Sequence, residues 1–221
     1  MKLTSVLFLL IFISCGKNNQ SESFEKFNEG VELNLKSIEE QNSGNYEKAV
    51  ELNRLSIEKF RETLKIDSTH STVRSALAHS LYIDKKYKEA IYWFEESNKV
   101  NGKQAQNYRE LGLCKINLGN IELGKVSIDK AFEMDKSKEI RNLTMLDLTD
   151  IGNLAFEYGE GFTKQNELEK GKNYKIFSIG VLKLAYEYDN QNKELALKIS
   201  EFANKINDIE TSLKYKQLSK E

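Results

Sequence analysis

Hydrophobic positions along most of the chain recur at intervals of three and four residues, the period of an amphipathic α-helix. Between Ala76 and Lys136 this pattern occurs twice, and each copy contains two helical stretches. Leu77 is followed by Leu111, and Ala90 by Gly124, each 34 positions further along the chain. The sequence therefore predicts a helix pair that repeats.

The residue types at these positions suit helices that pack closely. Small side chains allow two helices to cross, and they occur at Ala78, Ala90, Gly112, Gly124 and Ala131. Large apolar side chains fill the space between the crossings, at Leu77, Leu81, Tyr87, Phe94, Tyr108, Leu111, Ile121 and Ile128. Gly44-Asn45 and Gly119-Asn120 are expected to end one helix and begin the next, since Gly and Asn tolerate the left-handed conformation.

The fixed period with two helices per unit resembles the tetratricopeptide-repeat (TPR) family. The resemblance is specific across 71–138 and gives two clear repeats, 71–104 and 105–138. It implies an all-α fold, a right-handed α-solenoid whose first helices line a concave groove. The absence of proline, with only 12 glycines, also argues against an all-β fold.

The flanking sequence fits the repeat less well. Its degenerate repeats are expected at 24–70, 139–190 and 191–221. Together with the two clear repeats they give about five helix pairs over 24–221. Terminal units of a solenoid are often atypical because they cap the stack.

The N-terminus has the plan of a secretory signal peptide. Lys2 precedes an apolar run from Val6 to Ile13, and Ser14 and Cys15 follow. The run is too short to cross a bilayer as a helix. We predict that residues 1–14 are a signal peptide; the alternative is a short anchor helix that is not cleaved.

The end of this run, Phe12-Ile13-Ser14-Cys15, resembles the lipobox of bacterial lipoproteins. Phe12 departs from the usual leucine. The resemblance implies that Cys15 is acylated, that 15–23 form a lipidated tether, and that the protein is anchored in the bacterial cell envelope. Gly16 after the cysteine favours the periplasmic face of the outer membrane.

Neither the charge pattern nor the reactive residues indicate a nucleic-acid, metal, cofactor or phosphate site. Lys+Arg number 33 and Asp+Glu 34, interleaved, which gives no basic patch for nucleic acid. Two cysteines and two histidines do not form a metal or cofactor site by spacing. Cys114 is expected to be a buried structural thiol, and His70 to lie exposed in a loop. Gly159-Glu160-Gly161 before Lys164 lacks the spacing of a phosphate-binding loop and is interpreted as a helix-to-helix loop.

The first helices of the clear repeats supply the candidate partner-binding residues. These are Ser75, His79, Tyr82, Arg109, Leu113 and Ile116. Only Arg109 suits a clamp for a partner's C-terminal carboxylate, so such a clamp is not predicted. The mixed polar and apolar set suits an extended or helical peptide.

The segment 174–188 is apolar on more than one face. Such a helix is usually buried, and the alternative is a surface for a partner or for self-association. The function that the sequence favours is a non-catalytic, lipid-anchored scaffold that binds another protein or peptide in its groove. The alternative is an accessory subunit of an envelope assembly or enzyme complex that self-associates through 174–188.

Overall fold

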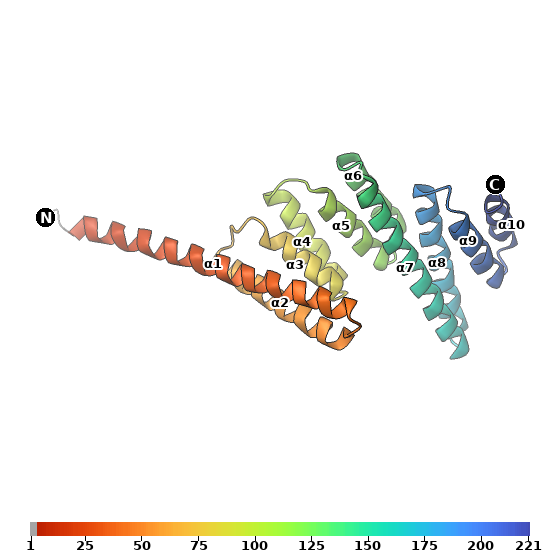
Figure 1. The fold of residues 1–221 in the computed structure, drawn as a ribbon, viewed down its shortest axis with the longest axis horizontal. Coiled ribbons are helices and arrows are strands. Elements are labelled where there is room, and N and C mark those ends of the chain that lie inside the picture. Colours follow the sequence, from red (N-terminus) through yellow and green to blue (C-terminus); the bar gives the residue numbers. More distant parts are fainter. Residues whose placement is uncertain (1–3) are drawn as a thin grey trace. The chain divides into compact units, whose positions relative to one another are not determined.

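The computed structural model describes the backbone of residues 4–221 and the side chains of residues 20–221. Within the described backbone it contains ten α-helices and no strands (Figure 1). The all-α prediction is therefore confirmed. The side chains of the predicted signal peptide 1–14 and of the predicted lipidation site Cys15 lie outside the described residues. The chain divides into two compact units, Met1–Glu110 and Leu111–Glu221.

Unit 1 contains helices that pack on their neighbours in the sequence. They are α1 Thr4–Asn42, α2 Tyr46–Ile66, α3 Val73–Ile83, α4 Tyr87–Val100 and the first turns of α5 Ala105–Asn117. α1 packs along α2 as a hairpin, α2 also contacts α3, and α3 packs on α4 (Figure 1). Ser23, placed by the sequence at the end of the tether, is buried within α1, so ordered structure begins before residue 24.

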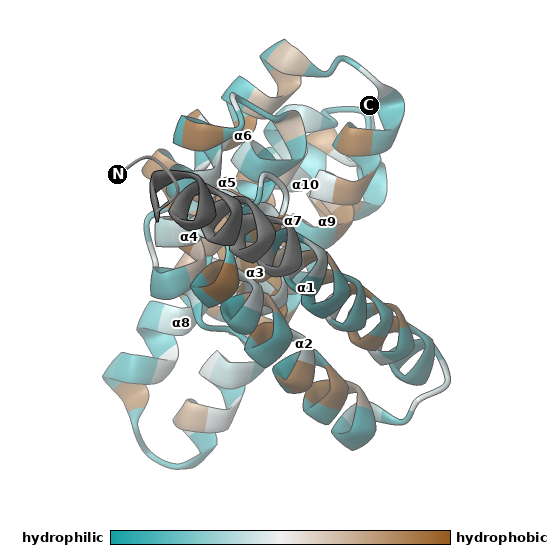
Figure 2. Ribbon diagram, turned by 90° about the vertical axis from the view of Figure 1, so that its left-hand side faces the viewer, coloured by the Kyte–Doolittle hydropathy of each residue, from teal (hydrophilic) through white to brown (hydrophobic). Residues whose placement is uncertain are grey.

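The amphipathic pattern directs the apolar faces of these helices inwards. Hydrophobic and hydrophilic residues alternate around α2 in the hydropathy colouring (Figure 2). The largest fully buried side chains of unit 1 are Phe60, Val73, Leu77, Leu81 and Phe94. Each buried aliphatic or aromatic side chain contributes about 1.5–3 kcal/mol to folding. These residues hold α2, α3 and α4 together.

Unit 2 continues the same arrangement in the second half of the chain. It contains the rest of α5, then α6 Ile121–Met134, α7 Lys138–Lys164, α8 Leu168–Tyr188, α9 Lys193–Lys205 and α10 Ile209–Leu218. α7 packs along α8, α8 contacts α9, and α9 packs on α10. α7 and α8 are longer than the helices of a standard repeat, because no proline interrupts 138–164 or 168–188 and the glycines within them do not adopt a positive φ.

Glycines allow the helices of unit 2 to approach closely. A Cβ atom at Gly112 in α5 would lie 2.7 Å from the carbonyl oxygen of Gly124 in α6. In the next pair, a Cβ at Gly159 in α7 would lie 2.8 Å from the carbonyl oxygen of Gly171 in α8. The interpretation of the segment around Gly159 as a loop is thus wrong. The segment is helical, and its glycine is needed where α7 meets α8.

One turn geometry closes all five helix pairs in the described chain. Each turn contains one residue with positive φ, and these residues are Gly44, Lys85, Gly119, Asn166 and Asn207. The amide of the next residue donates a hydrogen bond to a carbonyl five positions earlier, as Asn120 does to Lys115 and Glu167 does to Phe162. This is the Schellman motif, which satisfies the last carbonyls of a helix. The five predicted pairs are therefore present.

The apolar helix α8 is mainly an inner element of unit 2. Its buried residues include Ile179, Val181, Leu182, Leu184 and Ala185. Tyr174 and Ile176, nearer its N-terminal end, are exposed. Most of this helix is therefore buried, which agrees with the first of the two interpretations of the segment 174–188. Among the described residues, no helix combines the length and the apolar character needed to cross a membrane.

Candidate functional site

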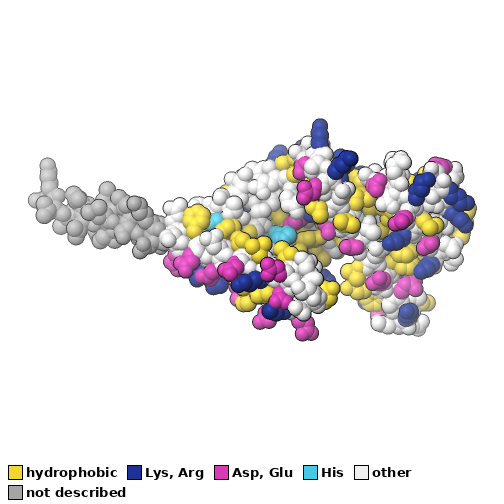
Figure 3. Space-filling model, in the orientation of Figure 1, with side chains coloured by type: hydrophobic (Ala, Val, Ile, Leu, Met, Phe, Trp, Pro, Cys, Tyr) yellow, Lys and Arg dark blue, Asp and Glu magenta, His cyan; other side chains and the backbone are white. Residues whose placement is uncertain are grey.

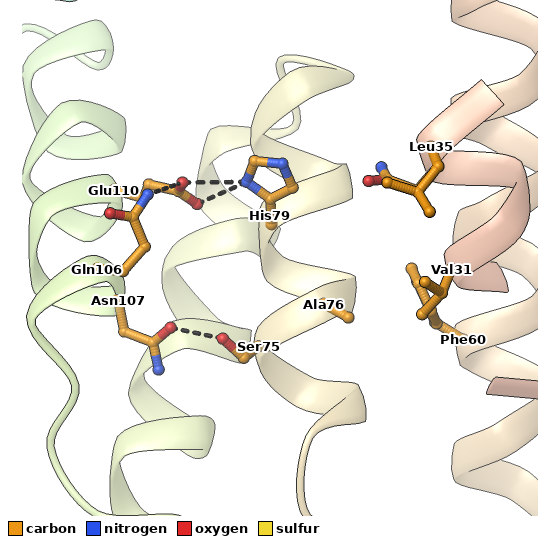
Figure 4. Close-up of a pocket in the computed structure, with 10 residues that line it drawn as sticks. Val31, Leu35, Phe60, Ser75, Ala76, His79, Gln106, Asn107 and Glu110 are labelled. Carbon is orange, nitrogen blue, oxygen red and sulfur yellow. Dashed lines mark hydrogen bonds and ion pairs between the residues drawn. The ribbon is translucent and has the colours of Figure 1, made fainter. Parts of the chain in front are cut away.

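A cavity of about 300 Å³ opens in unit 1 between three first helices. It is lined from α1 by Val31, Asn34 and Leu35, from α3 by Ser75, Ala76 and His79, from α5 by Gln106, Asn107 and Glu110, and from α2 by Phe60 (Figure 4). We call this cavity the unit 1 groove. On each first helix the first and last lining residues are four positions apart and the third residue is next to one of them, so the set lies within about one helical turn.

One wall of the groove is polar and centres on Glu110. The His79 Nδ1 lies 3.0 and 2.9 Å from the two carboxylate oxygens of Glu110 (Figure 4). The Gln106 side-chain amide donates a hydrogen bond of 2.6 Å to the same carboxylate. The Arg109 guanidinium is 3.7 Å from it. Because the carboxylate side chain is 4% exposed, these contacts compensate the cost of burying its charge.

A second hydrogen-bonded pair lies one turn earlier. Ser75 Oγ donates a hydrogen bond of 2.6 Å to Asn107 Oδ1 (Figure 4). The Asn107 amide nitrogen donates in turn to Ser97 Oγ at 3.2 Å and to Asn98 Oδ1 at 3.3 Å. The Ser75 hydroxyl hydrogen is directed to Asn107 and not to His79. The geometry therefore does not join Ser75 and His79 as a nucleophile and its base.

The opposite wall is aliphatic and aromatic. Val31 and Leu35 project from α1, and Phe60 reaches from α2 towards them (Figure 4). A Cβ at Gly30 would lie 2.6 Å from the Phe60 ring, so the glycine lets this ring lie against α1. Leu35 is 56% exposed although it is a large apolar side chain. An exposed leucine at the mouth of a cavity is available for contact with an apolar group of a partner.

A polar network fixes the backbone behind this wall. Asn34 Nδ2 donates a hydrogen bond of 3.2 Å to Ser80 Oγ, and so connects α1 to α3. Asn53 Nδ2 donates to the Ser80 carbonyl oxygen at 2.9 Å and connects α2 to the same point. Buried polar groups that satisfy one another make a packing arrangement specific. The helices α1, α2 and α3 are therefore held in one register.

The structure brings together two of the six predicted partner-binding residues. Ser75 and His79 line the groove. Arg109 is 5% exposed and lies behind Glu110, and Tyr82 is half-buried outside the groove lining. Leu113 and Ile116 are fully buried and do not face a partner. Ile116 packs towards α6, where a Cβ added at Gly124 would collide with it.

The error has a physical cause. The prediction moved the positions of Ser75, His79 and Tyr82 by one repeat of 34, which gives Arg109, Leu113 and Ile116. The residues of α5 that face α3 across the groove lie about one turn earlier, at Gln106, Asn107 and Glu110. The polarity of these three residues, against the apolar Leu113 and Ile116, is the sequence signal that could have identified them.

The prediction that His70 is exposed is wrong. Its side chain is 5% exposed, and its ring centroid lies 4.9 Å from that of Phe24 and 4.7 Å from that of Phe27. Neither ring nitrogen has a hydrogen-bond partner among the described residues. Burial lowers the pKa of this imidazole, and the nearby Asp67 carboxylate opposes that shift. Cys114 is buried as predicted.

A metal site would need several ligating side chains close together in the described part of the chain. No group of three or more His, Cys, Asp or Glu side chains in that part of the chain is arranged to hold a metal ion. The charged wall of the groove consists of ion pairs and amide hydrogen bonds. On the face of unit 1 shown in Figure 3, histidine and hydrophobic side chains lie next to one another. The groove offers polar contacts on one side and an apolar surface on the other.

All five helix pairs of the described chain have the same turn geometry between their two helices, and this common plan defines the class of fold. The chain is an all-α protein built of consecutive helix pairs, with a groove lined by successive first helices of unit 1. No family model matches the chain. It is 36% identical over 74 residues to "Sperm-associated antigen 1" of Rattus norvegicus, which covers 34% of this chain. The match spans 8% of the length of that relative.

Solved structures with a similar arrangement of helices share little sequence with the chain. MamA is 11% identical, with a TM-score of 0.43 over 83% of this chain and 91% of that one. YrrB, described as a TPR protein with an unusual peptide-binding site, is 16% identical, with a TM-score of 0.46 over 87% and 90%. PilF from Pseudomonas aeruginosa is 18% identical, with a TM-score of 0.39 over 88% and 90%.

Proposed function

We propose that the protein is a non-catalytic scaffold that binds a peptide segment of another protein in the unit 1 groove. The single observation that carries this proposal is the two-sided lining of the groove. Amide, imidazole and hydroxyl groups of α3 and α5 face Val31, Leu35 and Phe60 across one cavity. Peptide recognition uses this combination, in which polar groups orient the main chain and an apolar surface accepts a side chain.

The bound segment is extended or forms a short helix, with at least one aliphatic or aromatic side chain. A cavity of about 300 Å³ has room for one such side chain and the peptide units next to it. The His79–Glu110 pair lies beside this space and orients polar groups of the segment. We further propose that acylated Cys15 tethers the scaffold in a bacterial cell envelope, at the periplasmic face of the outer membrane.

A photo-crosslink from the groove tests the binding proposal. Leu35 is replaced by a photoreactive residue in living cells, because its side chain is exposed and lines the groove. We expect one discrete protein to be captured, and Ala76→Trp to abolish the capture by filling the groove. The captured protein, once purified, should bind the full chain in a calorimetric titration.

The matched control places the photoreactive residue at Tyr46, which is 67% exposed on α2 and outside the groove. Capture of the same protein from both positions would mean that the groove is not the binding surface. If Leu35→Glu leaves the binding of the purified partner protein unchanged, the proposal is also contradicted. We expect this substitution to weaken binding about tenfold or more, the effect typical of a central apolar contact.

The tether is tested by the substitution Cys15→Ala. We expect the variant to leave the membrane fraction and to appear in the soluble fraction, with the same helical circular dichroism as the wild type. A thioether-linked acyl group can form only on a cysteine, so the loss of anchoring should be complete. The conservative change Ser14→Ala leaves the thiol in place and is the control. A Cys15→Ala protein that stays with the membrane would disprove the lipid tether.

A further inference from the structure

An apolar surface on α1 extends beyond the unit 1 groove in both directions. Phe24, Val31 and Ile38 are seven residues apart, and Leu35 is three positions before Ile38. Because seven residues are close to two helical turns, these side chains lie on one face of α1, and we call them the α1 stripe. Phe24, Leu35 and Ile38 are 50%, 56% and 44% exposed, and Val31 is half-buried. The stripe is about 21 Å long at 1.5 Å per residue.

A row of three glutamates follows the α1 stripe along one side. Glu25, Glu32 and Glu39 are also seven residues apart, each one position after a member of the stripe, and we call them the acidic row. All three are exposed. Glu32 forms an ion pair of 3.0 Å with the exposed Lys36, and such pairs contribute little free energy. Glu25 and Glu39 have no ion-pair partner among the described residues.

The neighbouring cations do not neutralise the acidic row. Lys26 of α1 and Lys59 of α2 both pair with Glu29, at 2.8 and 2.9 Å, where these two helices meet. Across the groove the Glu110 carboxylate is buried and already bonded to His79. In Figure 3, acidic side chains lie along the lower edge of the front of unit 1, below a band of hydrophobic ones. The apolar surface therefore has a negative flank, which attracts a positively charged partner.

We propose that the occupant of the unit 1 groove is a basic amphipathic helix of another protein, packed lengthwise on α1. This inference rests on the proposed function and specifies the partner of the same site. The apolar face of the bound helix covers the α1 stripe, with anchors spaced three, four and seven residues apart as in other complexes of a helix with a groove. Its lysine or arginine side chains lie beside the acidic row.

The common period of the two rows selects a helix over an extended segment. A partner that matches both rows along their whole length has to repeat its own apolar and basic side chains in the same way. A helix does so, whereas an extended segment turns alternate side chains to opposite faces. About 15 residues, or about four turns, cover the α1 stripe. The acidic row also repels the anionic surface of a membrane, which selects a protein partner.

The test titrates the purified full chain with two designed peptides of about 15 residues. Both carry leucines at the spacing of the α1 stripe; one has lysines beside them and the matched probe has glutamates there. We expect calorimetry to detect binding of the lysine peptide alone, and binding to weaken as salt is added. We also expect the helical circular dichroism to exceed the sum of the separate components, because a peptide of this length is largely unfolded by itself.

Reversal of the acidic row makes the test specific for charge. The variant carries Glu25→Lys, Glu32→Lys and Glu39→Lys together, all at exposed positions, so the fold is retained. We expect it to bind the lysine peptide about tenfold more weakly or worse, since three favourable pairs become repulsive. We expect the glutamate peptide to bind this variant in its place.

A matched control changes the net charge equally on other faces of unit 1. It replaces three exposed glutamates of α2 and α4 that do not line the groove. The substitutions are Glu51→Lys, Glu58→Lys and Glu95→Lys. We expect it to retain the preference for the lysine peptide, with affinity within about twofold of the wild type in physiological salt, where distant charges are screened.

A single substitution tests whether the helix lies along α1 beyond the cavity. Ile38 belongs to the α1 stripe but does not line the cavity itself. We expect Ile38→Ser to weaken binding of the lysine peptide about tenfold, as the loss of an apolar anchor does. Unchanged binding by this variant would show that the partner does not follow α1, and would overturn the lengthwise arrangement.

The outcomes separate this inference from the proposed function. If the protein captured from position 35 binds the wild type and the acidic-row variant equally, groove binding stands and the basic helix is wrong. Binding of the lysine peptide without a gain of helix, or no binding at millimolar peptide, would overturn the inference too. So would binding of anionic lipid vesicles, or a doubled molecular mass in sedimentation, that Ile38→Ser abolishes, because the stripe would then belong to a membrane or to a second copy.

Discussion

At the scale of single residues, the buried imidazole of His70 gives the protein a dependence on pH. Its ring lies between Phe24 and Phe27, and its nitrogens have no hydrogen-bond partner among the described residues. Burial lowers its pKa in the folded state, so the unfolded chain binds the proton more readily than the folded chain. The free energy of unfolding therefore falls as the pH decreases through the range below about 6.5, the ordinary value for histidine.

We expect this dependence to disappear in His70→Phe. The wild type should lose at most about 1.4 kcal/mol of stability per pH unit through this group, because one proton is involved. The free energy of unfolding is measured by urea denaturation, followed by circular dichroism, at several pH values from about 7 to about 5. Carboxylates that do not interact with His70 affect both proteins alike. Equal slopes for the two proteins would show that His70 is not buried in its neutral form.

The sequence predicted the residue types of the core better than the exposure of individual polar residues. Ala90, Leu77 and Phe94 are buried as the helical period indicated. His70 follows a helix end and contains no periodic signal, and only its contact with α1 places it inside. Burial of this kind depends on residues more than 40 positions apart, which a local pattern does not contain.

At the scale of elements, close approach of two helices depends on glycine. We expect Gly112→Ala to destabilise the protein by about 1–3 kcal/mol, because the new Cβ would lie 2.7 Å from the carbonyl oxygen of Gly124 and force α5 from α6. The control is Gly161→Ala in α7, where nothing lies within 4 Å of the new Cβ. There we expect no loss, or a gain of up to about 1 kcal/mol from helix propensity.

Thermal denaturation of the two alanine variants measures this difference. If Gly112→Ala melts at the same temperature as the wild type, the crossing of α5 and α6 is looser than the structure indicates. If Gly161→Ala is as unstable as Gly112→Ala, its helix contacts another part of the chain. Both outcomes would require a different account of the glycines.

The sequence predicted the existence of the helices well and their length less well. The short pairs of the clear repeats and the turns at Gly44 and Gly119 follow directly from the pattern. The turns at Lys85, Asn166 and Asn207 adopt the same positive φ without glycine, and only the backbone geometry identifies them. α7 begins at Lys138, next to the predicted start of the degenerate repeat at 139, because Ser137 accepts a hydrogen bond from the Ile140 amide and caps it there.

At the scale of the whole molecule, stability is a sum of contacts between consecutive helices. Leu182 is fully buried in α8, and a Cβ at Gly152 of α7 would lie 2.6 Å from it. We expect Leu182→Ala to cost about 2–5 kcal/mol. Amide hydrogen exchange measured by mass spectrometry should accelerate most in α7–α10 and progressively less along the chain towards α1–α4.

Leu154→Ala is the matched control for this experiment. Leu154 belongs to α7 but is 42% exposed, so the same truncation should change exchange very little. A uniform acceleration along the chain in Leu182→Ala would mean that the protein unfolds as one cooperative body. In that case the two compact units would not be separate units of stability.

The candidate site at this scale was predicted only in part. The sequence identified the first helices of the two clear repeats as the lining of a groove and placed Ser75 and His79 in it. Val31, Leu35 and Phe60 belong to the degenerate first repeat, whose spacing fits the clear repeats less well, and they form the apolar wall. A site built from both regular and irregular repeats is visible only when the helices are placed in space.

The repeated turn between paired helices has a consequence for how quickly the chain reaches this state. Helices joined by each turn pack on one another, so most contacts connect residues close in sequence, and the contact order is low. Proteins with low contact order fold in microseconds to milliseconds, since little loop entropy is lost before contacts form. Each pair can therefore close while the next is still being synthesised, and the ribosome would release a chain whose early helices are already in place.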